Sequence, residues 1–195
     1  MQTVIETAPA KEPVTALDVK RQLNIEQSFM DDDIYLAGLI TASRLNAEQI
    51  TQRKLITQTW LAYLEEWPDN DSLRLPFGSL QSVTSVKYYE TDDTENTMSA
   101  AEYGVDTDST VGRVVLDYGE SWPTETLRPL NPIRVEFVCG YGDNGSDIPE
   151  PIRQAIKIDC ADMYWRRSSE TQGPRLKTIQ HLLQRYRIEM RPEWL

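Results

Sequence analysis

The sequence predicts an α+β fold, in which an α-helical frame carries an inserted antiparallel β-sheet or small barrel. Two long segments, 36–50 and 152–164, repeat apolar residues at spacings of three and four, which is typical of amphipathic helices. Between them lie several short segments of alternating apolar and polar residues, separated by turn-forming residues, and this pattern favours antiparallel strands. With 195 residues, the chain is long enough for one domain that carries an insertion.

The first helical part of the frame is predicted over residues 15–54. Thr15 has the residue type of a helix N-cap, and Asp18 three residues later completes a capping-box pattern. Three aspartates at 31–33 place negative charge where the dipole of a second helix favours it. The preceding residues 1–14 are polar, so we expect them to form a flexible N-terminal arm.

The β insertion is predicted over residues 55–140. Ile133, Val135 and Phe137 lie on one face of a predicted strand and charged residues lie on the other, which indicates a sheet with one buried face. The segment 119–132 is rich in proline, so we expect an irregular loop there. The predicted strands are 55–64, 73–75, 83–90, 102–106, 113–117 and 133–138.

The second part of the frame is predicted over residues 149–168, because Pro149 and Pro151 suit the start of a helix. We expect its apolar face to pack against residues 36–50, since neither helix can bury its apolar face alone. A main domain over 15–168 and a separate C-terminal helix and tail over 169–195 follow from this division.

The last helix has a narrow apolar stripe and the chain ends in an apolar pair. Such a stripe is typical of a helix that lies against a partner or in a groove, and an exposed terminal tryptophan is a suitable anchor. The other interpretation is that this helix folds back on the core of its own chain. If it docks, the chain should still fold when it is truncated after Ser169. The predicted docking residues are Leu176, Ile179, Leu183, Tyr186, Met190 and Trp194.

The formal charge of −11 is unevenly distributed. Residues 150–195 hold nine Lys and Arg against six Asp and Glu, so they carry +3, and residues 1–149 carry −14. The acidic bulk argues against nonspecific DNA binding through an outer surface, because phosphates are repelled. The basic C-terminal part indicates contact with a more acidic surface.

No segment predicts a membrane or secretory function. The chain lacks a run of about 18 apolar residues, so we expect no membrane span. Its N-terminus has neither the basic nor the apolar region of a signal peptide. Cys139 and Cys160 are expected to be free and mostly buried, although the sequence does not exclude that they lie close together.

The sequence shows no arrangement of residues that predicts a catalytic, metal or cofactor site. His181 is the single histidine, and a solvated or interface position explains it better than a catalytic role. The glycine-rich segment 140–145 lacks the order of a phosphate-binding loop and is expected to be a turn. Arg166 and Arg167, after Trp165, have two interpretations: a contact with DNA or an acidic partner, or cations that stabilise a helix C-terminus.

Several short motifs, taken in order, carry a resemblance to a known family. They are the acidic segment after the 17–23 helix, Leu55-Ile56-Thr57-Gln58-Thr59-Trp60, Leu75-Pro76, Leu80-Gln81-Ser82-Val83, Tyr103-Gly104-Val105-Asp106, Gly112-Arg113-Val114, Val138-Cys139-Gly140-Tyr141-Gly142 and Ile148-Pro149-Glu150-Pro151-Ile152. In this order and spacing, over residues 15–168, the chain resembles the gp6-like head–tail connector (adaptor) family of tailed bacteriophages.

The resemblance implies a structural protein and no enzyme. Members form rings, usually of twelve copies, that bind the portal protein at one end and a stopper or tail protein at the other. DNA passes through the lumen without sequence-specific binding, and no membrane is involved. The resemblance also implies a location in the virion neck, after assembly in the cytoplasm of the bacterial host, and C-terminal segments that reach onto the portal.

Two other classes of protein are weighed against this one. The first is a ligand- or carbohydrate-binding β module flanked by helices, with a pocket lined by aromatic residues such as Tyr88, Tyr89 and Trp122. The second is a hydrolase, which the sequence does not favour because no nucleophile and base can be paired in it.

Overall fold

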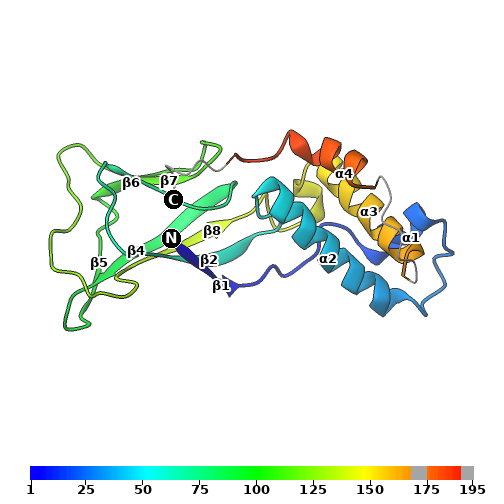
Figure 1. Cartoon of the computed structure of the whole chain (residues 1–195), viewed down its shortest axis with the longest axis horizontal. Coiled ribbons are helices and arrows are strands. Elements are labelled where there is room, and N and C mark those ends of the chain that lie inside the picture. The colour runs from blue at the N-terminus through cyan, green and yellow to red at the C-terminus, as the bar shows by residue number, and fades with distance from the viewer. Residues whose placement is uncertain (168–174, 190–195) are drawn as a thin grey trace. The chain divides into compact units, whose positions relative to one another are not determined.

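The computed structural model describes residues 1–167 and 175–189, and these fall into two units (Figure 1). The β unit comprises Met1–Ala8 and Thr57–Gly140, and the helical unit comprises Pro9–Ile56 and Tyr141–Ile188. In the sequence, Thr57–Gly140 is therefore inserted between two parts of the helical unit, and Met1–Ala8 precedes both. The predicted α+β class is confirmed, and the described strands form open antiparallel sheets and no closed barrel.

The helical unit is built on helices α1 (Ala16–Leu23), α2 (Asp33–Thr51), α3 (Glu150–Trp165) and α4 (Arg175–Gln184), with a 3-10 turn at Gly145–Asp147. The predicted capping box forms at the start of α1, where the amide of Asp18 donates to Thr15 Oγ1 and the amide of Thr15 donates to the Asp18 carboxylate. No helix in the described part of the chain is long and apolar enough to span a membrane.

One apolar core holds the four helices together, and α3 contacts each of the other three. Leu36 and Ile40 of α2 lie in the same core as Ile152 and Ile156 of α3, and the two helices are in contact, which confirms the predicted packing of the two amphipathic helices. The core also includes Val19 and Leu23 of α1, Cys160 of α3, and Ile179 and Leu183 of α4.

The β unit contains a five-stranded and a three-stranded antiparallel sheet. The larger has the strand order β1-β2-β8-β4-β5, and the smaller has the order β3-β7-β6. The strands are β1 (Gln2–Thr7), β2 (Gln58–Leu64), β3 (Ser72–Arg74), β4 (Leu80–Tyr89), β5 (Glu95–Thr97), β6 (Tyr103–Asp106), β7 (Arg113–Leu116) and β8 (Ile133–Cys139).

The two sheets share a second apolar core, centred on β8. Ile133, Val135 and Phe137 are fully buried in it, as their alternation predicts, together with Val86 of β4 and Val114 of β7. The segment 119–132 has no helix or strand, also as predicted, apart from a single bridge between Leu127 and Glu90.

The predicted flexible arm over residues 1–14 is wrong. Gln2–Thr7 forms β1, an edge strand in which Gln2 pairs with Tyr63 and Thr7 pairs with Thr59 of β2. Residues 11–14 lie on the helical unit, where Glu12 binds Arg44 and Val14 enters the core. The arm is ordered because distant segments supply its partners, and composition alone does not report such partners. A second strand, β5, lies between the predicted strands 83–90 and 102–106, where the sequence predicts no strand.

Replacing Phe137 with Ala should lower the free energy of unfolding by about 3–5 kcal/mol, because a cavity would open where both sheets meet. The measurement is urea unfolding followed by tryptophan fluorescence. The control is Thr84→Ala, an exposed position on β4, which should change the free energy by less than about 0.5 kcal/mol. Equal losses of unfolding free energy in the two variants would show that Phe137 contributes no more to stability than an exposed residue.

A second prediction concerns Asp106, the last residue of β6. Its carboxylate accepts hydrogen bonds from the hydroxyl of Ser109 at 2.6 Å, the amide of Ser109 at 3.0 Å and Arg113 Nε at 2.9 Å. These bonds, with that from the Ser109 hydroxyl foremost, lower the pKa of Asp106 to about 2.

A lowered pKa means that the folded state favours the ionised carboxylate. The stabilisation is therefore complete above the ordinary pKa of 3.8 and is lost as the pH falls towards 2. Asp106→Asn should be less stable than the native chain at pH 6 and should lose less stability between pH 5 and pH 2. Urea midpoints measured across this range test the prediction, with the exposed Asp108→Asn as the control. Parallel pH profiles for native chain and Asp106→Asn would refute it.

Candidate docking surface

Helix α4 is held on the helical unit by its apolar side. Ile179 and Leu183 are 3 % and 0 % exposed, respectively, and Leu182 and Tyr186 pack half-buried against the same core. The opposite side, which includes Lys177, is exposed. The spacing of apolar residues in α4 thus serves packing within the chain, and the polar side is what a partner would meet.

The end of this segment is anchored to the end of α2. The amide of Ile188 donates to the carbonyl of Thr51 at 2.9 Å, and Nε of Arg53 donates to the carbonyl of Tyr186 at 2.7 Å. These two bonds fix the point from which the chain continues towards its C-terminus.

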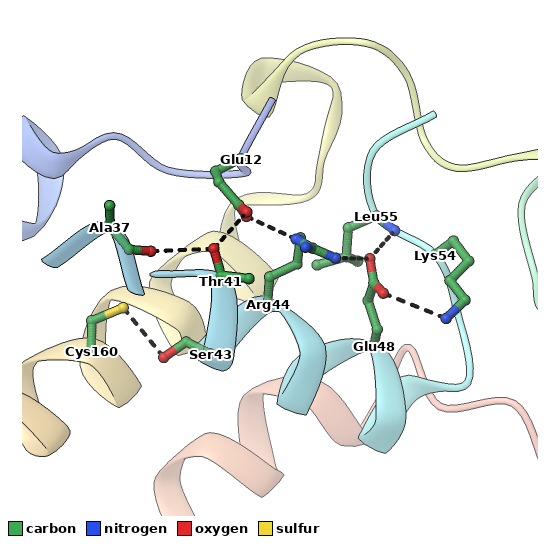
Figure 2. Close-up of polar contacts among 9 residues, drawn as sticks. All are labelled: Glu12, Ala37, Thr41, Ser43, Arg44, Glu48, Lys54, Leu55 and Cys160. Atoms are coloured by element: carbon green, nitrogen blue, oxygen red, sulfur yellow. Dashed lines mark hydrogen bonds and ion pairs between the residues drawn. The ribbon is translucent and has the colours of Figure 1, made fainter. Parts of the chain in front are cut away.

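The end of α2 is itself held by a buried polar network (Figure 2). The carboxylate of Glu48, which is 4 % exposed, accepts from the amide of Leu55 at 3.1 Å and lies 3.5 Å from Nη1 of Arg44 and 3.5 Å from Nζ of Lys54. Nε of Arg44 binds Glu12 at 2.8 Å. Because buried charges are stable only when they are paired, the network fixes α2, the chain that follows it and residue 12 against one another.

One further contact extends this network, and a separate one lies near it (Figure 2). The hydroxyl of Thr41 donates to Glu12 at 3.0 Å, and the thiol of Cys160 lies 3.3 Å from the hydroxyl of Ser43. Burial raises the pKa of the Cys160 thiol to about 11, so it stays protonated near neutral pH. Cys139 and Cys160 are both free and buried, as the sequence analysis expected.

Arg166 and Arg167, the predicted contacts with DNA or an acidic partner, are both engaged within the helical unit. Nε of Arg166 binds Asp162 at 3.0 Å, one turn back along α3. Arg167 lies 3.4 Å from Asp32, and its guanidinium stacks over the rings of Tyr35 and Tyr164.

Asp32 also accepts a hydrogen bond from the hydroxyl of Tyr164. This bond, followed by the contact with Arg167, lowers the pKa of Asp32, and the same bond raises the pKa of Tyr164. Asp32 makes no side-chain cap bond at the start of α2, so its carboxylate serves mainly to join α2 to the end of α3.

The six predicted docking residues therefore differ in their surroundings. Ile179 and Leu183 are used in the core, and contact with a partner through them would require α4 to leave that core. Tyr186 packs against the core as well. The side chain of Leu176 and the residues Met190 and Trp194 lie outside the described part of the chain. The expectation that the chain folds after truncation at Ser169 does not fit the structure, because the truncation would remove Ile179 and Leu183 from the core.

A groove between α2 and α4 was not predicted. It has a volume of about 590 Å³ and is lined mainly by carboxamide side chains, here called the amide groove: Asn46, Gln49, Gln52, Gln180 and Gln184, with Arg187 beside them. The sequence signal was the spacing of Asn46 and Gln49 by three and of Gln180 and Gln184 by four, which puts each pair on one face of its helix.

Other residues considered from the sequence have structural positions. His181 is exposed on α4. An added Cβ at Gly145 would lie 2.3 Å from the carbonyl oxygen of Pro13, so glycine is needed there for close approach of two chain segments. Across residues 1–167 and 175–189, no group of three or more His, Cys, Asp or Glu side chains is placed to hold a metal ion.

The aromatic residues proposed for a ligand-binding pocket are engaged within the β unit. The ring of Trp122 stacks on Trp67 at 4.9 Å, and the ring of Tyr88 meets the edge of Trp67 at 6.0 Å. Arg128 lies 3.9 Å above the ring of Tyr89. These contacts do not favour an aromatic platform for a ligand.

The described fold is shared with chains in solved structures of gene transfer agent particles. No model of a known protein family matches the sequence, and no curated protein sequence matches it. Among solved structures, the chain is similar to one in the neck of an empty gene transfer agent (GTA) particle computed with C6 symmetry, with 20 % identity and a TM-score of 0.82.

Two further solved structures have the same fold. A chain in the virion of the native GTA particle has 20 % identity and a TM-score of 0.81, and one in the neck of the native GTA particle, computed with C12 symmetry, has 21 % identity and a TM-score of 0.77. In all three comparisons the match covers 98 % of each chain.

Replacing Glu48 with Ala should lower the free energy of unfolding by about 3–5 kcal/mol, because Arg44 and Lys54 would lose the carboxylate that they share. The measurement is urea unfolding followed by circular dichroism at a helix wavelength. Gln49→Ala, at the exposed neighbouring position, is the matched control and should stay within about 0.5 kcal/mol of the native chain. A loss for Glu48→Ala as small as that of the control would show that the network contributes little.

Proposed function

We propose that the chain is a structural subunit of the neck of a phage-like particle, where it acts as a head–tail connector and not as an enzyme. The observation that carries this proposal is the shared fold with chains of GTA necks over 98 % of both chains. An irregular α+β arrangement of two units, matched over nearly its whole length, is more specific than a common domain fold.

The proposed mechanism is geometric. Copies of the chain form a closed homo-oligomeric ring through cyclic heterologous contacts, in which one surface of each copy meets a different surface of the next. The C6 and C12 symmetries of the similar neck structures support this arrangement, and we propose twelve copies. One end of the ring binds the portal protein and the other end binds a stopper or tail protein.

The ring would hold DNA in its lumen without binding it in a sequence-specific way. The net charge of −11 supports this proposal, because an acidic wall repels phosphates and lets a duplex slide. In this proposal the protein is assembled in the cytoplasm of the bacterial host and remains in the virion neck.

We propose that the C-terminal segment makes the contact with the portal. Ile179 and Leu183 fix α4 on the helical unit, and the bond from Ile188 to Thr51 fixes the start of the tail. The tail itself then supplies Met190 and Trp194, of which a tryptophan is well suited to fill a pocket on the partner. This arrangement uses the apolar stripe of α4 as the support of the docking segment.

The experiment that tests the proposed function is native mass spectrometry of the purified chain mixed with its cognate portal ring. Binding of as many copies as a closed ring requires to one portal ring supports a connector. A stable monomer that does not bind the portal would contradict the proposal and favour a ligand-binding β module.

Removal of residues 190–195, or Trp194→Ala, should leave a folded chain that binds the portal at least about tenfold more weakly, because the proposed anchor is lost while the described core is kept. Portal affinity measured by biolayer interferometry tests this, with circular dichroism as the check on folding. The matched control is Trp165→Ala, which removes an exposed tryptophan from α3. Unchanged affinity in the shortened chain would refute the docking role of the tail.

A further inference from the structure

The two units differ sharply in charge. Residues 1–8 and 57–140 hold five Lys and Arg against sixteen Asp and Glu, so the β unit carries −11. Residues 9–56 and 141–188 hold fourteen against thirteen, so the helical unit carries +1. The excess negative charge is therefore concentrated in the β unit, whereas the helical unit is nearly neutral overall and can present a local cluster of cations.

On the helical unit, three exposed cationic residues lie on α4 and in the residues just after it. Lys177, Arg185 and Arg187 are all exposed, and in the described ranges none of them has an acidic partner. Arg187 also lies at the amide groove. We call these three residues the basic face.

The amide groove beside the basic face suits a protein segment with exposed main-chain groups. A carboxamide offers both donors and an acceptor, so these side chains can bind the N–H and the C=O groups of a turn or an extended segment. The amides of Asn46 and Gln52 each already donate one hydrogen bond within the chain, to Asp159 and to the carbonyl of Gln49, which leaves Gln49, Gln180 and Gln184 as the main contacts for a partner. A single guanidinium in the groove adds a site for one carboxylate.

The β unit carries a segment with the matching chemistry. Glu65, Glu66, Asp69 and Asp71 lie in the connection between β2 and β3, all four are exposed, and none has a cationic partner within residues 1–167 and 175–189. We call this connection, residues 65–71, the acidic turn. Like charges gathered on one short segment repel one another, so a cationic partner would relieve this repulsion.

The acidic turn is also held in one conformation. Nε1 of Trp122 donates to the carbonyl of Asn70 at 2.8 Å, and the side chain of Asn70 accepts from the amide of Ser72 at 2.9 Å. The stacked rings of Trp67 and Trp122 support the turn from the β unit. A rigid turn loses little conformational entropy when it binds, which favours recognition by a partner.

We propose that the basic face and amide groove of one copy bind the acidic turn of the neighbouring copy. This inference rests on the proposed ring, in which each copy must present two different and complementary surfaces. A second copy is the occupant that the charges favour, because the acidic turn and the basic face occur on the same chain in equal number. DNA fits the groove less well, since carboxamides outnumber the guanidinium and the chain as a whole is acidic.

The first test is a charge reversal with a rescue. Arg187→Glu should weaken assembly of the full chain on its cognate portal ring, measured by native mass spectrometry, by about tenfold or more in the concentration required. Adding Asp69→Arg to the same chain should restore assembly, because the two reversed charges attract again. The matched control is Arg21→Glu, an exposed arginine in the last turn of α1, which changes the net charge by the same amount.

The second test is a cross-link between different copies. A mixture of Gln184→Cys chains and Asp69→Cys chains should form a disulfide-linked heterodimer under mild oxidation, since the native cysteines are buried. Thr84→Cys in place of Asp69→Cys, also an exposed position of the β unit, should not form it. Equal cross-linking of both mixtures would overturn the assigned contact.

The outcomes distinguish a failure of the proposed contact from a failure of the proposed ring. If native chain and Arg187→Glu assemble equally well on the portal, the ring stands and the contact is refuted. If the native chain does not assemble at any concentration, both proposals fail. Loss of assembly in Arg187→Glu and in the control Arg21→Glu alike would show an effect of net charge and refute a specific contact.

Discussion

The buried carboxylate of Glu48 is the constraint on which the helical unit depends. Arg44, Lys54 and the amide of Leu55 all meet on it, and Glu12 joins through Arg44. A charge removed from water is costly unless its partners are placed well, so these segments have few alternative arrangements. Thr51 and Arg53, in the same region of the chain, then hold Ile188 and Tyr186, which follow α4. The point where the tail begins is in this way fixed by a network that starts near the N-terminus.

The apolar core and the polar network contribute differently to the structure of the helical unit. The core supplies the driving force that brings four helices together, but apolar contacts alone allow neighbouring helices to slide. Directional contacts, such as those of Asp32 with Tyr164 and Arg167, select one arrangement of α2 against α3. The result is a support in which Arg44, Arg166 and Arg167 are each paired within the unit, whereas Lys177 on α4 is exposed.

The sequence predicts well those features that depend on nearby residues. The cap at Thr15, the start of α3 at its prolines and the alternation of Ile133, Val135 and Phe137 are local patterns, and each appears in the structure as expected. Strand β1 could not be predicted in this way. Val4 and Ile5 lie on opposite faces and are 44 % and 43 % exposed, so the strand has no buried face to mark it, and its partner is more than 50 residues away.

The candidate docking surface is also hard to predict from local sequence patterns. A stripe such as Ile179 and Leu183 reveals that one face of a helix is covered, but not whether the cover is the same chain or a partner. Asp32 looked like a favourable charge at a helix start, whereas its main partners come from a segment 132 residues later. Long-range pairs of this kind leave no local trace in a single sequence.

The entry and exit of the β unit have a consequence for how a foreign domain could be grafted into such a chain. Gln58, the first residue of β2, is paired directly with Cys139, the last residue of β8, so the inserted segment leaves the sheet beside the point where it entered. Antiparallel partners of this kind have Cα atoms about 5 Å apart. The segment 58–139 therefore begins and ends at one place in the sheet, as a short loop does. Strand β1 joins the same sheet from the N-terminal side and pairs with β2, so a foreign domain grafted in place of the insertion would have to offer β1 an equivalent edge.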